Sequence, residues 1–319
     1  MLSRVALVLA ATSLTVSLAP PASAQTNPLW HEDKIKNFLP HMTWPEVRDL
    51  LTRTDMALIP VPSIEQHGPQ TPMGTDFYAG VEEAKLIAQR TDVLVAPVLL
   101  AGQSPYHMGF PGTITLSSDT IQRVYFEAAQ SLIQHGFRRF LFLNSHAGNQ
   151  YITRFVVDRI NQETAAVAVE LGDAADTMRA TSTQTGSAAR SDRFDRFDRF
   201  DRHGGVGETS RAMYLFPSLV QIEKAARAPL TLPPDLAKML PEVVKGDRAA
   251  TLIFLAEGLK PKDTGKHTST AEMTATGVWS ERDPHEATAE QGRRASEGFV
   301  DAAVRFIERW KTLRTMSRP

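Results

Sequence analysis

The chain has 319 residues, of which 35 are Lys or Arg and 36 are Asp or Glu, so its formal net charge at pH 7 is −1. A charge this close to zero argues against nucleic acid as a partner, because nucleic-acid binding needs a clustered basic surface. The sequence contains 0 Cys, which excludes disulfides, thiolate metal sites and cysteine nucleophiles. Any chemistry of this protein must therefore use oxygen and imidazole groups.

Residues 1–24 have the pattern of a secretory signal peptide. Arg4 supplies a basic start, residues 5–18 are mostly apolar, and residues 22–24 fit the small-x-small cleavage pattern. The apolar run is too short for a comfortable membrane span, and charges interrupt every later apolar run. We therefore expect a soluble, periplasmic or secreted protein whose residues 25–319 form a single domain.

The next part of the chain predicts helices and strands in alternation. A helix begins near Thr43, which has Glu46 at the spacing of a capping box. Ser118 or Asp119 is the expected cap of a later amphipathic helix. Short apolar runs are typical of strands that are covered on both faces. We expect strands over 56–61, 93–100, 140–143 and 166–171, and helices over 77–90, 119–135 and 151–163.

Repeated strand–loop–helix order predicts an α/β fold with right-handed crossovers, a mainly parallel sheet and helices on both faces. In such sheets, sites form at the carboxyl ends of the strands. Residues 172–200 interrupt the pattern and include Arg-Phe-Asp repeats over 193–201. We interpret them as a long surface loop, which is a lid, a subunit contact or a disordered insertion. A helix over 201–215, an irregular segment over 225–250 and a final amphipathic helix after Pro284 follow.

One stretch, residues 59–77, carries the first candidate site. Glu65 and His67 lie two residues apart, so at the extended end of a strand both side chains leave on the same face. The Pro/Gly-rich turn that follows lets Asp76 fold back towards them. Carboxylates with an imidazole suit a divalent metal, although the same three residues could simply hydrogen-bond to one another in a polar loop.

More polar residues follow the other predicted strands. A single histidine there is more often a hydrogen-bonded loop residue than a ligand, but many such groups at one rim would require costly burial. A pair of divalent cations removes that cost. The chain has no G-x-S-x-G or G-x-G-x-x-G pattern in the required context, which argues against a serine nucleophile or a nicotinamide cofactor. The candidates are Glu65, His67, Asp76, His107, His146, His203 and Glu208.

Four stretches in order, SIEQHGPQTPMGTD, HMGFPGT, NSHAGN and DRHGGVGETS, resemble the successive motifs of the creatininase (creatinine amidohydrolase) family. The resemblance covers residues 44–294. It implies a three-layer α/β/α fold and hydrolysis of a non-peptide C–N bond in an amide, lactam or formamide. It also implies a homo-oligomer, usually a hexamer, and two divalent metal ions, namely zinc with a second zinc, manganese or iron.

The resemblance also implies roles for individual residues. Glu65 matches a ligand of one metal, His67 matches a ligand of the other, and Asp76 matches the bridging carboxylate. His146 matches a further histidine ligand. Glu208, in the family's ETS motif, is expected to reach the metals. A hydroxide that bridges the two ions would then attack the carbonyl carbon, because metal ions lower the pKa of bound water.

Other matched positions concern the substrate. His203 matches a histidine that moves a proton, and either it or His107, which we also expect to contact substrate, protonates the leaving nitrogen. In creatininase the position of Gly148 is a glutamate ligand, so the second metal needs another carboxylate, for which Glu208 is our candidate. Arg202 replaces a substrate-contacting glutamate of creatininase, and this change of charge disfavours creatinine.

Alternatives to an amidohydrolase remain open on the sequence. The HAGN form of the third motif is shared with other branches of the family, including formamide hydrolases. The same hydroxide could open a lactone or another cyclic ester. A non-catalytic exported protein that keeps the fold and a metal to capture a solute is a further alternative, and Gly148 in place of a ligand is the observation that favours it.

Overall fold

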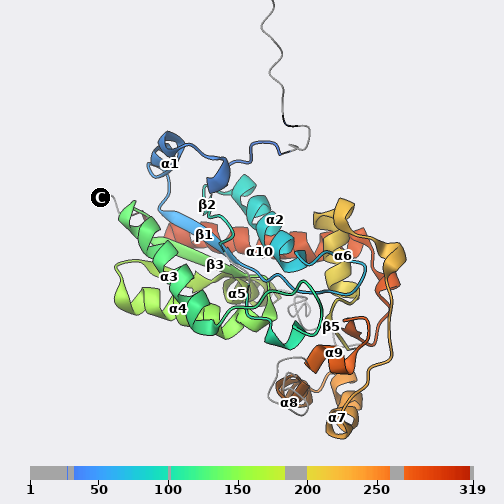
Figure 1. The fold of residues 1–319 in the computed structure, drawn as a ribbon. Helices are drawn as coiled ribbons and strands as arrows, with labels where there is room; N and C mark the ends of the chain where they lie inside the picture. The colour runs from blue at the N-terminus through green and yellow to red at the C-terminus, as the bar shows by residue number, and fades with distance from the viewer. Residues whose placement is uncertain (1–26, 28–31, 100–101, 184–199, 259–268, 317–319) are drawn as a thin grey trace, which may run out of the picture. The chain divides into compact units, whose positions relative to one another are not determined.

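A four-stranded parallel sheet forms the middle layer of the protein (Figure 1). The computed structural model describes residues 27, 32–99, 102–183, 200–258 and 269–316. The sheet order is β2-β1-β3-β4, and every residue of β1 is buried, as expected for a strand covered on both faces. The strands are β1 (Met56–Val61), β2 (Leu94–Val95), β3 (Arg139–Asn144) and β4 (Val167–Glu170).

Helices cover both faces of this sheet, and the alternation of side chains along each strand supplies both cores. Ile59 of β1 packs on the face covered by α3 (Ser118–Gln134) and α4 (Gln150–Glu163). Leu58 packs on the opposite face, with side chains of three other helices. The predicted three-layer α/β/α fold is confirmed. The helices of the second face are α2 (Thr75–Arg90), α5 (Leu171–Thr183) and α10 (Ala289–Leu313).

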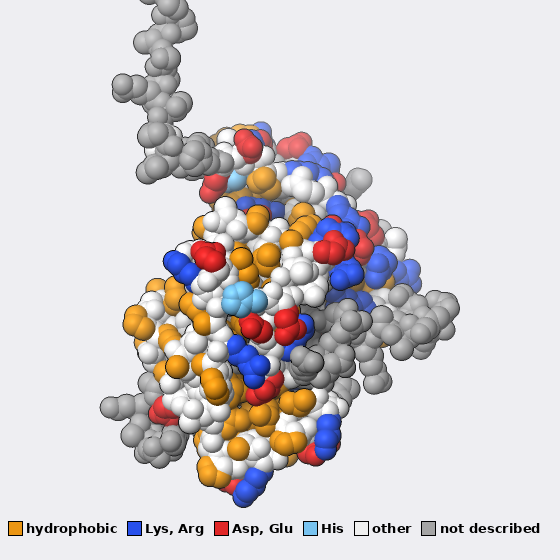
Figure 2. Space-filling model, turned by 90° about the vertical axis from the view of Figure 1, so that its right-hand side faces the viewer, with side chains coloured by type: hydrophobic (Ala, Val, Ile, Leu, Met, Phe, Trp, Pro, Cys, Tyr) orange, Lys and Arg blue, Asp and Glu red, His pale blue; other side chains and the backbone are white. Residues whose placement is uncertain are grey.

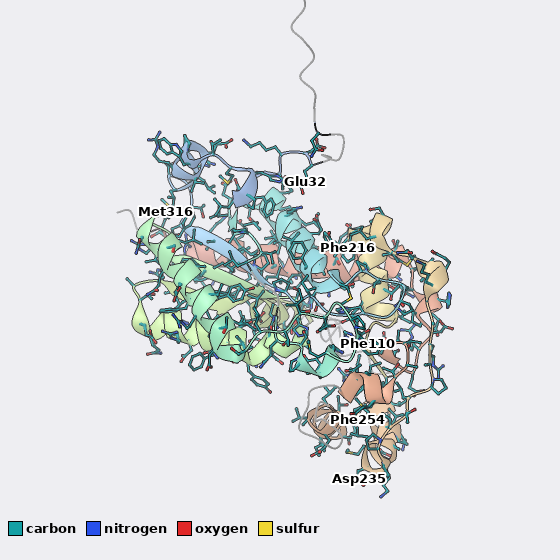
Figure 3. The ribbon with its side chains drawn as sticks, viewed as in Figure 1. Glu32, Phe110, Phe216, Asp235, Phe254 and Met316 are labelled. Atoms are coloured by element: carbon teal, nitrogen blue, oxygen red, sulfur yellow. The ribbon has the colours of Figure 1, made fainter. Side chains whose placement is uncertain are left out.

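A smaller assembly follows in the C-terminal half. Strand β5 (Asp201–His203) pairs antiparallel with β6 (Trp279–Ser280), and α7 (Pro234–Val244), α8 (Arg248–Gly258) and α9 (Ser269–Met273) contribute to the apolar cluster beside it. Phe254 of this cluster is labelled in Figure 3. The remaining elements are η1 (Leu39–His41), α1 (Trp44–Leu50), η2 (Pro105–His107), η3 (Ala147–Asn149), α6 (Val206–Leu215), η4 (Pro217–Leu219), η5 (Ile222–Lys224) and η6 (Pro284–Glu286).

The structure corrects several expected elements. The loop expected over 172–200 is wrong in its first part, where α5 packs apolar side chains against the sheet. Residues 184–199 lie outside the described residues, but Phe200 of the last Arg-Phe-Asp repeat is fully buried in the cluster with α7 and α8. The segment 225–250, expected to be irregular, contains α7 and the start of α8 because an amphipathic face is available there despite its prolines.

Smaller corrections concern element ends. Ser117, not Ser118 or Asp119, caps α3, because its side chain accepts a hydrogen bond from the backbone N–H of Thr120. Of the strand expected over 93–100, only Leu94 and Val95 pair with β1. The capping box between Thr43 and Glu46 is present as expected.

The chain divides into two units, Met1–Lys34 and Ile35–Pro319. The described residues of the first, 27 and 32–34, contain neither helix nor strand, and the expected signal peptide over 1–24 lies outside the described residues. Across the described ranges, none of the helices combines the length and apolar character needed to cross a bilayer. On the face of the molecule in Figure 2, acidic and basic side chains are interspersed.

Candidate metal centre

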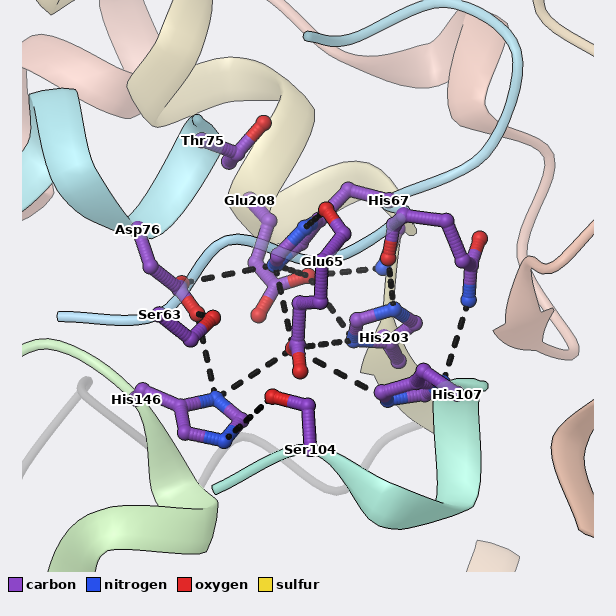
Figure 4. A network of polar contacts seen from close by, with 12 residues as sticks. Ser63, Glu65, His67, Thr75, Asp76, Ser104, His107, His146, His203 and Glu208 are labelled. Atoms are coloured by element: carbon purple, nitrogen blue, oxygen red, sulfur yellow. Dashed lines mark hydrogen bonds and ion pairs between the residues drawn. The ribbon is translucent and has the colours of Figure 1, made fainter. Parts of the chain in front are cut away.

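Polar side chains converge beyond the carboxyl ends of β1 and β3, whose last residues, Val61 and Asn144, pair in register. The carboxylate of Glu65 lies at the centre of the group (Figure 4). The structure brings together all seven residues that the sequence selected as candidates. From Glu65 Oε1, the nearest imidazole nitrogens are His146 Nδ1 at 3.2 Å, His67 Nε2 at 3.7 Å, His203 Nδ1 at 3.7 Å and His107 Nε2 at 3.8 Å.

Asp76 lies between two histidines, in the first turn of α2. Its Oδ1 is 3.3 Å from His67 Nε2, and its Oδ2 is 3.1 Å from His146 Nδ1. The hydroxyl of Ser63 donates a hydrogen bond of 2.6 Å to Oδ2. The helix N-terminus favours a carboxylate at this place. One oxygen facing each histidine is the arrangement that a carboxylate bridging two ions needs.

Glu208 reaches the same cluster from the first turn of α6. Its Oε2 accepts a 2.6 Å hydrogen bond from the backbone N–H of Gly204 and lies 3.7 Å from His67 Nε2 and 3.9 Å from His203 Nδ1. Asp201 accepts hydrogen bonds from the first backbone N–H groups of α6 and thereby caps the helix. Gly204 has a φ of +60° and its α-carbon side faces the carbonyl of His67 so closely that a Cβ would collide.

The donor set fits divalent cations. Three groups of side chains each offer ligand atoms within 4.8 Å of one another, with only oxygen and imidazole donors, which are ligands of zinc and manganese in proteins. Glu65 Oε2 and His67 Nε2 are buried without a hydrogen-bond partner among the described residues, as expected of atoms that face an ion. The groups are Glu65–His67–Asp76, His67–His203–Glu208 and Glu65–His107–His203.

Two histidines carry the positive charge of the metal-free cluster. Burial alone would lower the pKa of His67, but Asp76 and Glu208 raise it to about 10. Burial also opposes the charge of His146, yet Glu65 and Asp76 hold its pKa well above the usual value. Protons therefore occupy positions between the carboxylates that divalent cations can take over.

The carboxylates respond in different ways to the same site. Burial favours the neutral acid, but the neighbouring histidines hold the pKa of Asp76 well below its usual value, and His146 and His203 lower that of Glu65. Burial raises the pKa of Glu208 to about 7. Glu208 is thus the carboxylate whose ionisation depends most on a cation being near.

His107 and His203 are neutral by contrast. Burial, reinforced by neighbouring histidines, holds the pKa of each ring well below its usual value. The rings stack on each other, with centroids 4.0 Å apart and an interplanar angle of 18°. Neutral rings can accept or donate a hydrogen bond without adding charge to the site.

The surroundings of His146 explain why a glycine occupies position 148. His146 Nε2 donates to the carbonyl of Gln103 at 3.1 Å and lies 3.2 Å from the hydroxyl of Tyr106 and 3.3 Å from that of Ser104. A Cβ on Gly148 would overlap the Tyr106 hydroxyl and the His146 ring. The glutamate that creatininase has at this position therefore does not fit here.

Sequence reasoning missed the residues that hold these side chains in place. Ser63, Gln66, Ser104 and Tyr106 all contact a predicted site residue. The available signal was their position within the same motifs. The extended geometry assumed for Glu65 was also inaccurate, because β1 ends at Val61 and the residue lies in the following loop. Arg202 lies beside His203 on β5 and is half-buried, and its contact with substrate stays a prediction.

Fold and site together define a class: a three-layer α/β/α protein with a candidate centre for divalent cations at the carboxyl edge of its sheet. A family model described as "Creatininase: Creatinine amidohydrolase" matches residues 40–307. The chain belongs to the creatininase family, and it is a hydrolase of that family's amidohydrolase class.

Known proteins show the same relationship. A mycofactocin precursor peptide peptidase of Mycobacterium tuberculosis is 28% identical over 266 residues, which cover 79% of this chain and 84% of that protein. The creatinine amidohydrolase of Pseudomonas putida is 28% identical over 215 residues, covering 62% and 79%. A creatininase crystal structure superposes with a TM-score of 0.63 at 22% identity, covering 86% of this chain and 98% of that one, and supports the fold.

Proposed function

We propose that this protein hydrolyses a non-peptide C–N bond, in an amide, lactam or formamide, with two divalent ions held by the buried cluster. The convergence of Glu65, Asp76 and Glu208 around His67 carries the proposal. Three buried carboxylates are costly to keep together without cations. The metal-free cluster holds protons instead, which is how a metal-binding set of ligands behaves.

The cluster divides the work between metal binding and proton movement. Glu65, His67, Asp76, His146 and Glu208 would hold the ions, with Asp76 facing both positions. Divalent ions there would lower the pKa of a bound water, bridging in our proposal, and polarise a carbonyl oxygen.

His203 has a neutral ring whose Nδ1 faces Glu65 and Glu208. Such a nitrogen can accept a proton from water and pass it to the leaving nitrogen. The ring is thereby charged in one step and returned to its neutral form in the next. We assign the proton transfer of the reaction to His203.

Metal removal tests the proposal directly. Chelation should abolish hydrolysis, and Zn²⁺ or Mn²⁺ should restore it. Creatininase structures of a zinc–zinc type and with manganese support this choice of ions. Elemental analysis of the purified protein should find two ions per chain, and Asp76→Ala should lose metal and hydrolysis together. A metal-free protein that still binds a solute would instead favour the non-catalytic alternative.

Glu208 is our proposed replacement for the ligand that Gly148 cannot supply. Glu208→Gln should lower the occupancy of one metal and leave the other bound, because Glu208 lies near His67 and His203 but not near His146. Glu127→Gln, an exposed change on α3, is the matched control and should keep both ions. An unchanged stoichiometry in Glu208→Gln would refute this assignment.

The substrate is proposed to differ from creatinine. Arg202 places a cation beside His203, so an anionic or neutral substrate is favoured over a basic ring. Arg202→Glu should weaken hydrolysis of any anionic substrate, and an unaltered preference would sink the inference. A panel of lactams, formamides, imides, lactones and short peptides, the last because one relative is a peptide peptidase, separates the amide proposal from the ester alternative.

Export and assembly are further parts of the proposal. Cleavage before Gln25 would place the enzyme in the periplasm or outside the cell, where N-terminal sequencing of the fractionated protein should find Gln25 first. Recovery of the full-length chain in the cytosol would contradict export. Light scattering on the purified protein should show a homo-oligomer, with a hexamer as the expected size, and a monomer would refute this expectation.

A further inference from the structure

Gln66 lies between the two metal-site residues Glu65 and His67, and its contacts extend to two other parts of the chain. It is only 6% exposed. Its side-chain Oε1 accepts the backbone N–H of Gly68 at 3.0 Å, and its Nε2 donates to the carbonyl of Gly277 at 3.1 Å. A backbone N–H can only donate and a carbonyl can only accept. These two contacts therefore settle which end of the amide is oxygen and which is nitrogen.

The second N–H of this amide points at a histidine. Gln66 Nε2 lies 3.2 Å from His107 Nδ1. Because the amide nitrogen has no acceptor lone pair, Nδ1 must accept the hydrogen bond and carry no proton. The proton of the neutral His107 ring is then on Nε2, the nitrogen that faces Glu65 Oε1 at 3.8 Å.

The backbone carbonyl of the same residue holds His203. His203 Nε2 lies within hydrogen-bond distance of Gln66 O, and a carbonyl requires this nitrogen to donate. His203 Nδ1, which faces Glu65 and Glu208, therefore presents a lone pair. Both stacked rings are protonated on Nε2, but one shows an N–H to the site and the other a lone pair.

We propose that Gln66 is a positioning residue that presents His107 to the site as a neutral N–H donor and leaves His203 as the lone-pair donor. This inference rests on the proposed hydrolase function. His107 Nε2–H is then neither a metal ligand nor a source of protons, because removing that proton would leave an anionic imidazole. It donates a hydrogen bond to the substrate oxygen on which negative charge develops.

The assignment changes the expected division of labour. Sequence reasoning left His107 and His203 as equal candidates for protonating the leaving nitrogen. The donor–acceptor pattern separates them, since only His203 has a free lone pair with which to receive a proton before passing it on. It also argues against a metal held by Glu65, His107 and His203 together, although their atoms lie close enough.

Nitrogen-detected NMR of protein labelled with ¹⁵N-histidine tests the proposal without relying on activity. In wild-type protein, zinc-loaded and metal-free, we expect His107 as the Nε2–H form. In Gln66→Met the side-chain contact is lost while the backbone carbonyl stays. We therefore expect the His107 signal to shift towards a mixture of both forms and that of His203 to persist.

Gln70→Met is the matched control. Gln70 is also a buried amide of the same loop, but its Nε2 donates to the carbonyls of His67 and Gly204 and to the Thr209 hydroxyl rather than to an imidazole. The tautomers of His107 and His203 should not change in this variant. A change of the same size in both variants would show that Gln66 acts only by holding the loop together.

Kinetics and metal content complete the test. On any substrate that the panel identifies, Gln66→Met should lower kcat ~10- to 100-fold with KM little changed, and His107→Ala should lower it about 100-fold with both metals retained. Loss of metal in His107→Ala, or wild-type His107 protonated on Nδ1, would overturn the proposal. If Gln66→Met does not fold, these two measurements still decide. Expected tautomers in a protein without any hydrolytic activity would instead count against the proposed function alone.

Discussion

His67 Nε2 lies 3.3 Å from Oδ1 of Asp76, and both side chains are buried. In metal-free protein this contact is an ion pair, because the carboxylates raise the pKa of His67 to about 10. The proton on His67 thus stands where a divalent cation would neutralise the same carboxylate. Metal binding and protonation compete for one position, and this competition can be measured.

The stability of metal-free protein should fall as the pH rises from 6.5 to about 10. Between these values the folded state binds a proton on His67 that the unfolded state has released, so each step up in pH favours unfolding. We expect a decrease on the order of a few kcal/mol between pH 7 and 9.5 in urea titrations. His67→Gln should flatten this dependence. An equally steep decrease in that variant would show that His67 is not its source.

Gly148→Ala should destabilise the protein by about 1–3 kcal/mol, because the added methyl group would overlap Tyr106 and His146. Gly298→Ala, on the exposed side of α10 with no atom within 4 Å of the added Cβ, should instead stabilise by about 0.5–1 kcal/mol. Thermal unfolding of both variants checks this pair. Equal effects would mean that the space around residue 148 is open.

Ser63→Ala should weaken metal binding ~10- to 100-fold by removing the 2.6 Å hydrogen bond that holds Asp76 Oδ2. Calorimetric titration of metal-free protein with Zn²⁺ measures the effect. Ser131→Ala, whose hydroxyl bonds only to the backbone of α3 at an exposed position, is the control. The affinities of wild type and Ser63→Ala would be the same if Asp76 were held by other contacts.

Glu83→Ala should destabilise the protein by about 3–5 kcal/mol, since it leaves Arg211 without its buried partner at 2.6 Å. The exposed pair of Arg293 and Glu297 on α10 gives the comparison. Glu297→Ala should cost less than about 1 kcal/mol. Denaturant midpoints of the two variants decide, and similar losses would contradict the distinction between buried and exposed pairs.

Much of the fold was predictable from local pattern. Every residue of β1 is apolar, and such a run indicates a strand covered on both faces. The polar motifs follow the strands, so parallel order alone placed His146 and Glu65 at one edge of the sheet. The failures were equally local: α5 was missed because its Ala- and Thr-rich sequence has a weak pattern, although Leu171 and Ala175 pack on the sheet.

The sequence by itself determined which residues could bind cations, because the chain has no cysteine and its carboxylates and histidines lie in motifs at strand ends. It could not determine the state of each imidazole. His107 and His203 differ in what they show to the site only because Gln66, 41 and 137 residues away, offers an amide N–H to one ring and a carbonyl to the other. Tertiary structure decides this, since a tautomer is set by the partner that folding brings to the ring's far nitrogen.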